Sequence, residues 1–245
     1  FGISDLEEGV IAAGVALHYL NETQHHQTKN ILSISRIEEE KYVWMDRFTI
    51  RNLELFYSPN EGAKTLIEVL DDTKSAMGSR MLRRWLALPL KNEKQISVRH
   101  NIVEQMLADD KLSSVLSEEI ARIGDLERLI SKVATQRINP RECGRLKDAL
   151  IALKPIQEIC SASGKDLQKL TSKINVCESI KERIANELSD NPPMLLHKGN
   201  VIKEGVNTDL DELRSIQNSG KEYLNKMLAR EIERTGITSL KISFN

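Results

Sequence analysis

The sequence predicts a mainly α-helical fold with a few short strands and one long helix near the C-terminus. Only 12 of the 245 residues are glycine and 6 are proline, so the residues that interrupt helices are scarce. Apolar residues recur at intervals of three and four, which is the spacing of one helix face. Residues 209–235 continue this pattern for about 40 Å at a rise of about 1.5 Å per residue, longer than a typical globular helix.

The N-terminal part is predicted to contain a helix, a linker and a β-rich segment. In residues 6–20, apolar side chains alternate at spacings of four and three, which predicts an amphipathic helix. The polar run NETQHHQTKN follows as a linker, and His25 and His26 lack the further ligands of a metal site, so a solvated loop is favoured. Between Ile31 and Tyr57, β-branched and aromatic residues partly alternate, which predicts a few short strands.

Helices are predicted for most of the chain after Leu66. The run MGSRMLRRWLAL forms an apolar face that ends before Pro89, and Asn92 is placed to cap the helix that follows. Further helices are predicted at residues 111–135, 141–160 and 166–189. The glycine-containing segment HKGNVIKEGVN then predicts a loop or a short hairpin.

The last helical run is predicted to project as an arm. Its residues near heptad spacing are Leu210, Leu213, Gly220, Leu224 and Met227. Gly236 follows as a helix stop, and the alternating ITSLKISFN predicts a strand. Because a lone strand is not stable, we expect its partner to lie beyond Asn245.

Charge and cysteine content favour a cytoplasmic protein. The formal net charge is -1, so any basic surface that attracts nucleic acid must be local. Three widely separated cysteines, Cys143, Cys160 and Cys177, exclude the common zinc spacings and suit a reducing compartment. Neither a secretory signal nor an apolar run long enough for a membrane helix is visible. Because the chain begins at Phe1, we expect it to be part of a longer protein.

The stretch SPNEGAKTLIEVL contains the elements of a phosphate-binding loop but in the wrong arrangement. That loop requires Gly-x-x-x-x-Gly-Lys-Ser/Thr, because its glycines let backbone N–H groups turn towards the phosphate. When the motif is aligned on Lys64 and Thr65, its two glycine positions hold Ser58 and Ala63. The stretch is better interpreted as a turn that leads into a helix, and no nucleotide site is expected there.

A basic run leaves two interpretations open. Residues 74–99 contain seven basic residues and one acid, and such a face can neutralise phosphates. Alternatively, the same residues form the solvated side of a helix or pair with acids elsewhere. We favour this second interpretation, because no aromatic platform for single strands is interleaved. No nucleophile elbow, zinc-protease motif or paired catalytic carboxylate motif is present.

Several ordered motifs run through the whole chain. They are LDDTKSAMGSRMLRRWLALPL, GDLERL, the helix start Pro140-Arg141, IKEGVNTDLDELR and ERTGITSLKISFN, preceded by FGISDLEEGVIAAGVALHYLNETQ. This series resembles the MutS family of DNA mismatch repair proteins, bacterial type. The resemblance implies the C-terminal end of the connector domain in residues 1–28, the core (lever) domain in 29–204, and a lever helix with the beginning of the clamp domain in 205–245.

For the whole protein, the resemblance implies a homodimeric clamp around mismatched double-stranded DNA that also binds repair partner proteins. An N-terminal domain would insert a phenylalanine at the mismatch, and a C-terminal domain would hydrolyse ATP with Mg²⁺. This chain has neither motif, so we expect no catalytic, cofactor-binding or metal-binding residue in it, and expect the fragment to be a monomer.

The resemblance therefore predicts a structural role in mismatch repair. The lever region would couple the ATP state to DNA binding without catalysis of its own, and Arg234 and Lys241 are the candidates for contact with DNA. One alternative is a helical protein-interaction scaffold that does not bind DNA. Another is a spacer within an ATPase. Salt-dependent DNA binding separates the lever from the scaffold.

Overall fold

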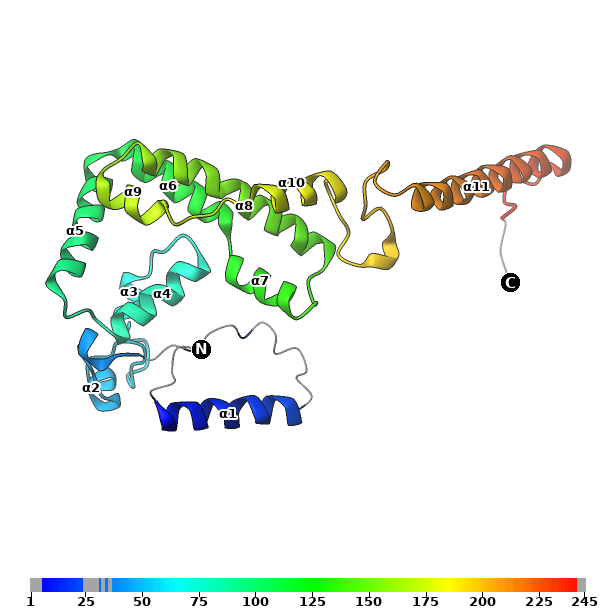
Figure 1. Ribbon diagram of the computed structural model, residues 1–245. Coiled ribbons are helices and arrows are strands. Elements are labelled where there is room, and N and C mark those ends of the chain that lie inside the picture. The colour runs from blue at the N-terminus through cyan, green and yellow to red at the C-terminus, as the bar shows by residue number, and fades with distance from the viewer. Residues whose placement is uncertain (1–5, 24–30, 32–33, 35–36, 242–245) are drawn as a thin grey trace.

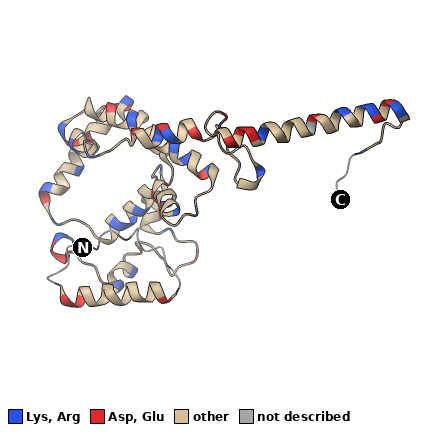
Figure 2. Ribbon diagram, turned by 45° about the vertical axis from the view of Figure 1, so that its right-hand side comes forward, with Lys and Arg blue, Asp and Glu red and all other residues tan. Residues whose placement is uncertain are grey.

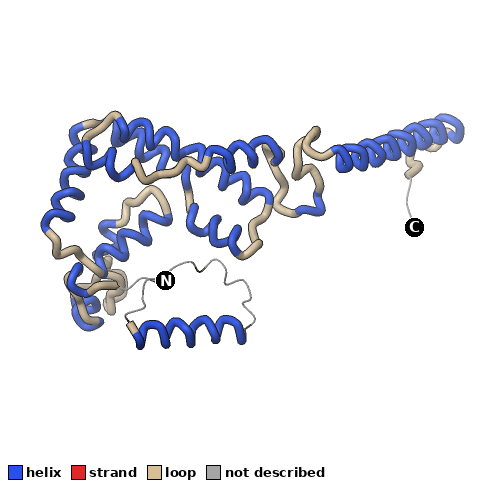
Figure 3. Tube along the Cα trace, viewed as in Figure 1, coloured by secondary structure: helices blue, strands red, loops and turns tan. Residues whose placement is uncertain are grey.

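The protein is a curved helical body from which one long helix projects (Figure 1). The computed structural model describes residues 6–23, 31, 34 and 37–241. Within these residues the chain is mainly helical, and β-structure is limited to two isolated bridges (Figure 3). The mainly α fold predicted from the sequence is therefore confirmed. The domain boundaries after residues 28 and 204 stay predictions.

The helices follow the order of the chain. They are α1 (Glu7–Glu22), α2 (Arg47–Asn52), α3 (Leu66–Leu70), α4 (Ala76–Ala87), α5 (Glu93–Ala108), α6 (Asp110–Ile123), α7 (Leu126–Ala134), α8 (Pro140–Ser161), α9 (Lys165–Thr171), α10 (Glu178–Glu187) and α11 (Thr208–Thr235). Two 3₁₀ turns, Glu39–Lys41 and Leu196–Lys198, complete the described elements.

Several helices begin at a side-chain cap that is formed by residues close together in the sequence. The Asn92 side chain accepts a hydrogen bond from the backbone N–H three residues on, which confirms the predicted start of α5. Thr65 and Glu68 form a capping box at α3, and Asn139 and Glu142 form another at α8. Each box satisfies backbone N–H groups that have no partner inside the helix.

The core lies where α6, α8 and α9 meet, with α5 packed against them. Its buried side chains are Leu112, Leu116, Ile156, Cys160 and Leu167. The pair α6 and α8 makes the most extensive contact between helices, and Figure 1 shows the two running side by side. Cys160 is 1% exposed, and burial raises its pKa, so this thiol behaves as a small apolar core residue.

Two long helices expected from the sequence are each divided. The segment 111–135 breaks into α6 and α7 at Gly124, whose φ of 64° lies in the left-handed region that glycine adopts without steric penalty. The segment 166–189 breaks into α9 and α10 before Cys177, whose φ is 48°. The two breaks let α7 and α10 turn back and pack against α8. Tertiary packing therefore divides segments whose continuous apolar pattern predicts a single helix.

The expected short strands between Ile31 and Tyr57 are wrong for the part that the structure describes. Tyr42 forms a single antiparallel bridge with Leu90, and α2 follows because the Asp46 carboxylate accepts from the Thr49 N–H at 2.6 Å. This cap outweighs the β preference of the neighbouring residues, which is context-dependent. Of the expected C-terminal strand, residues 237–241 are not a strand, and 242–245 lie outside the described residues.

Helix α11 is a single helix of 28 residues, as the periodicity predicts. The Asn207 side chain caps its start, and Gly236, with φ of 71°, ends it. Its apolar stripe is exposed to solvent: Leu213 and Ile216 are 65% and 66% exposed. At about 1.5 Å per residue the helix is about 42 Å long and extends away from the body (Figure 1).

Candidate functional site

Of the two predicted DNA-contact residues, one lies at the far end of α11 and the other lies just beyond it. Arg234 lies in its last turn, with a side chain 72% exposed and an ion pair to Glu231 at 2.8 Å. Lys241 follows the helix and is exposed. Both groups are therefore accessible, although the acid on the preceding turn offsets part of the positive charge of Arg234.

Charge is distributed unevenly along α11. Acids predominate at its base, whereas bases and acids are mixed in its distal half (Figure 2). The acids at the base are Asp209, Asp211 and Glu212, and the distal half holds Lys226, Arg230 and Arg234 together with Glu222, Glu231 and Glu233. This order also suits the helix dipole, which favours acids at the N-terminus and bases at the C-terminus. Residues 226–241 carry four bases and two acids, and this basic tip can contact phosphate groups.

Four of the seven basic residues of the predicted run, Lys74, Arg80, Arg83 and Arg99, make ion-pair or cation–π contacts within the body. Arg80 of α4 donates to Asp125 Oδ1 at 2.7 Å and to Glu127 Oε2 at 2.6 Å, across the gap to α7. Arg99 stacks 3.6 Å from the Trp85 ring centroid. These contacts favour the structural interpretation of the basic run.

Replacement of Arg80 tests this ion pair. Hydrogen bonding from Arg80 is the largest cause of the lowered pKa of the Asp125 carboxyl. A carboxyl group whose pKa is lower in the folded state than in the unfolded state stabilises the fold at pH values above its unfolded-state pKa. That stability is lost as the pH falls through its folded-state pKa. We expect Arg80→Gln to raise the pKa of Asp125 towards its ordinary value, measured by carboxyl ¹³C NMR titration. The exposed tip variant Arg234→Gln is the control and should leave it unchanged. An unaltered Asp125 titration in Arg80→Gln would refute the assignment.

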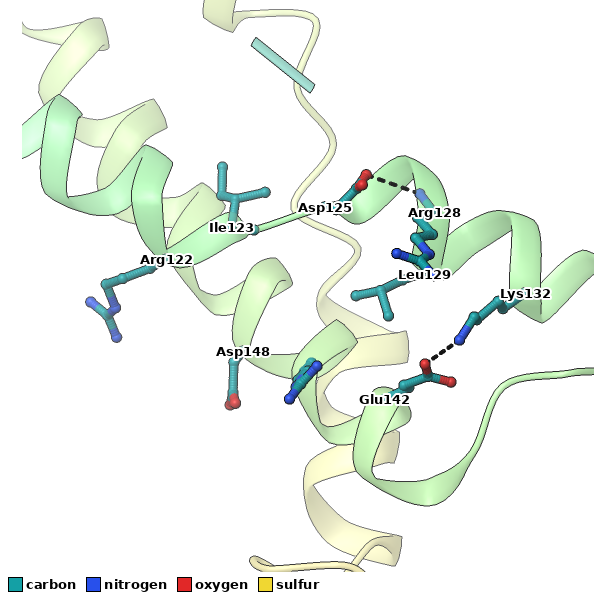
Figure 4. Close-up of a pocket in the computed structure, with 10 residues that line it drawn as sticks. Arg122, Ile123, Asp125, Arg128, Leu129, Lys132, Glu142 and Asp148 are labelled. Carbon is teal, nitrogen blue, oxygen red and sulfur yellow. Dashed lines mark hydrogen bonds and ion pairs between the residues drawn. The ribbon is translucent and has the colours of Figure 1, made fainter. Parts of the chain in front are cut away.

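A cleft of about 450 Å³ lies between the end of α6, α7 and the start of α8 (Figure 4). Its charged lining consists of Arg122, Arg128, Lys132 and Arg145 with Asp125, Glu142 and Asp148. Lys132 pairs with Glu142 across the cleft, and this hydrogen bond is the largest cause of the lowered Glu142 pKa. The Lys132–Glu142 ion pair therefore joins α7 to the start of α8 at this cleft.

The segment between α10 and α11 forms a structured connection. Ser189 N–H donates to Val201 O and Lys203 N–H donates to Glu187 O, both at 2.9 Å, around the Leu188–Ile202 bridge. Lys203 Nζ also pairs with Asp190 at 2.9 Å. The sequence indicated a loop or short hairpin here, and the structure shows one antiparallel bridge.

The described residues contain no group of three or more His, Cys, Asp or Glu arranged to hold a metal ion. The paired histidines, His25 and His26, fall outside these residues. No helix in the described ranges is both long and apolar enough to cross a membrane.

Sequence reasoning missed two features that the structure assembles. The first is the pairing of Arg80, in the basic run, with the acids of the GDLERL motif, which are 45 and 47 positions away. At the base of α11, Arg214 donates to the Ile202 carbonyl at 2.7 Å. The only sequence signal for the second was the Asp211/Arg214 spacing of three, which brings the two onto one helix face.

Comparison with known proteins identifies the family. The family described as MutS domain III matches residues 48–241. The DNA mismatch repair protein MutS of Bacteroides fragilis (strain YCH46) is 50% identical over 246 aligned positions, covering 100% of this chain and 28% of that relative. The MutS proteins of Christiangramia forsetii and Cytophaga hutchinsonii are 48% and 50% identical, again over 100% of this chain and over 28% and 29% of their own lengths.

This chain thus spans a little over a quarter of the length of the curated relatives it matches. The match covers α2 to α11 and therefore includes the core, the Arg80 ion pair and the projecting helix. The resemblance inferred from the ordered motifs is confirmed. The chain belongs to the MutS family, and the larger part of it is MutS domain III.

Proposed function

We propose that this chain is the lever region of a longer DNA mismatch repair protein. It would couple ATP binding and hydrolysis in one part of that protein to DNA binding in another, without catalysis of its own. The observation that supports this most is α11, one uninterrupted helix of 28 residues that extends from the body. The names of the relatives, which are DNA mismatch repair proteins, supply the biological context.

A long helix suits this task because its hydrogen-bonded backbone resists bending. A rotation of about 10° at the base of a helix about 42 Å long displaces its tip by about 7 Å. Such a displacement can open or close a contact with DNA. Two distant sites become coupled when both bias the same two arrangements of a rigid element.

The DNA-contacting end of the lever would be the basic tip, with Arg234 and Lys241 as contacts to phosphate. ATP and Mg²⁺ would bind in another domain of the longer protein, which would act as a cytoplasmic homodimer with repair partner proteins. The alternative is a protein-interaction scaffold without DNA binding. The exposed apolar residues Leu213, Ile216 and Tyr223 on α11 favour this alternative.

Charge removal at the tip of the full-length protein tests the DNA contact. We expect Arg234→Gln with Lys241→Gln to weaken binding to mismatched duplex DNA, because two phosphate contacts are lost. The slope of log affinity against log salt should fall by about 1 to 2, since each phosphate contact releases about one counterion. Fluorescence anisotropy across a salt series measures both quantities.

The matched control is Lys169→Gln with Lys173→Gln. Both lysines are exposed: Lys169 lies in α9 and Lys173 lies just after it. Helix α9 is at the opposite end of the molecule from α11 (Figure 1). The control removes the same charge and should leave affinity and slope nearly unchanged. Equal losses in both double variants would indicate a global charge effect. No loss in the tip variant would favour the scaffold.

A further inference from the structure

The base of α11 is tied back to the segment that precedes it. Arg214 Nη2 donates to the Ile202 carbonyl at 2.7 Å, and Arg214 Nη1 donates to Asp211 Oδ1 at 2.9 Å. The second oxygen of Asp211 accepts from the Gly205 N–H at 2.7 Å. The Arg214 side chain is only 20% exposed, whereas the tip arginine Arg234 is 72% exposed.

The receiving segment is itself fixed to the body. Ile202 forms the antiparallel bridge with Leu188, immediately after α10, and Lys203 Nζ donates to the Ala185 carbonyl of α10 at 2.9 Å. A continuous series of hydrogen bonds therefore runs from α10 through Ile202 to Arg214 on α11. Figure 1 shows the connecting segment between the two helices.

Packing between helices supplies little of this connection. In the described residues, α11 makes no extensive contact with another helix. Of its three apolar side chains near the base, Leu213 and Ile216 are mostly exposed and Leu210 is half-buried. The direction of α11 relative to the body therefore depends on the hydrogen bonds at its base.

The backbone conformation at Gly205 allows its N–H to bond to Asp211. Gly205 has a φ of 82°, a left-handed conformation that other residues adopt at a steric penalty. A Cβ at this position would meet no atom within 4 Å, so glycine is required by conformation and not by space. The turn aims the Gly205 N–H at Asp211, and Asp211 in turn holds Arg214.

We propose that Arg214 is the positioning residue of the lever. Its guanidinium joins Asp211 on its own helix to the Ile202 carbonyl on the body side, and so fixes the direction in which α11 leaves the body. This inference rests on the proposed function, because a fixed direction matters only if motion of the body must reach the tip. A planar guanidinium with several N–H donors can hold both partners at once.

If Arg214 acted only within α11, its effect on the helix would be different. An i,i+3 ion pair between Asp211 and Arg214 alone would stabilise the first turns of α11 and leave its direction free. A lysine at position 214 would keep that charge pair. Its single ammonium on a flexible stem lacks the fork that reaches both partners.

Distance measurements on this chain test the joint directly. Glu158 on α8 and Asn225 on α11 are both exposed and are each replaced by a ketone-bearing residue. Spin labels are attached to the two ketones, so the native cysteines stay in place. Pulsed electron–electron double resonance measures the distance between the two labels. It should give a narrow distance distribution for the chain that keeps Arg214. We expect Arg214→Gln to widen it at least twofold and Arg214→Lys to fail to restore it. Circular dichroism should show equal helix content.

The control is Arg234→Gln, which removes another i,i+3 ion pair of α11 far from the joint. It should leave the distribution narrow. A narrow distribution in Arg214→Gln would overturn the inference, as would full restoration by lysine or equal widening in the control.

The full-length protein separates this inference from the proposed function. Loss of the response of ATP hydrolysis to mismatched DNA in Arg214→Gln, together with the widened distribution, supports both. A widened distribution with a normal response supports the joint and contradicts the lever. A narrow distribution contradicts the joint whatever the ATPase response.

Discussion

Replacing Gly220 by proline is expected to separate ATP hydrolysis from DNA recognition in the full-length protein. Gly220 lies inside α11, is exposed, and would place a Cβ in open space, so the substitution acts on the helix and not on packing. Proline removes one backbone hydrogen bond and clashes with the preceding turn, which costs about 3 kcal/mol or more in a helix interior. We expect ATP hydrolysis to persist while its stimulation by mismatched DNA is largely lost, measured by steady-state ATPase assays with and without DNA.

Gly220→Ala is the matched control for this prediction. Alanine stabilises a helix interior by about 1 kcal/mol relative to glycine, and it meets no neighbouring atom at this position. The stiffer helix should keep the response to DNA. If the proline variant retains normal mismatch-stimulated hydrolysis, α11 does not transmit the ATP state and the lever proposal is wrong.

Truncating Leu116 to alanine is expected to produce the largest loss of stability. Leu116 is 4% exposed within the cluster formed by α6, α8 and α9. Removing a buried leucine loses its transfer free energy and leaves a cavity, which together lower the free energy of unfolding by about 2–5 kcal/mol. Urea unfolding followed by circular dichroism measures this loss.

The control for the core is Leu107→Ala, since Leu107 lies on α5 and is 79% exposed. Its effect should stay within about 0.5 kcal/mol, as for ordinary surface positions. A similar loss for both variants would mean that the cluster is not the main source of stability in the body.

Helix starts and stops were largely predictable because they depend on neighbouring residues. Asn92 caps α5 and Gly236 ends α11, as their positions in the sequence indicate. The apolar period also predicted α11 as one long helix. Breaks inside periodic segments were not predictable, because Gly124 and Cys177 interrupt helices only where the chain must reverse onto α8.

The candidate site was less predictable than the fold. Arg234 and Lys241 were chosen by resemblance; the structure leaves both accessible, and their contact with DNA stays a prediction. Arg80 belongs to the basic run and to the motif LDDTKSAMGSRMLRRWLALPL, and neither of these predicts its partners. Its partners, Asp125 and Glu127, lie more than 40 positions away, so their pairing depends on how α4 and α7 are placed.

The sequence by itself determined the family, the helical class and the long terminal helix. These follow from ordered motifs and from hydrogen bonds within a few residues, which local chemistry dictates. Tertiary structure alone decided that Arg80 joins α4 to α7 and that Arg214 is hydrogen-bonded to the Ile202 carbonyl. The reason is physical: a periodic pattern specifies which face of a helix is apolar, whereas contacts between distant residues depend on how the helices pack.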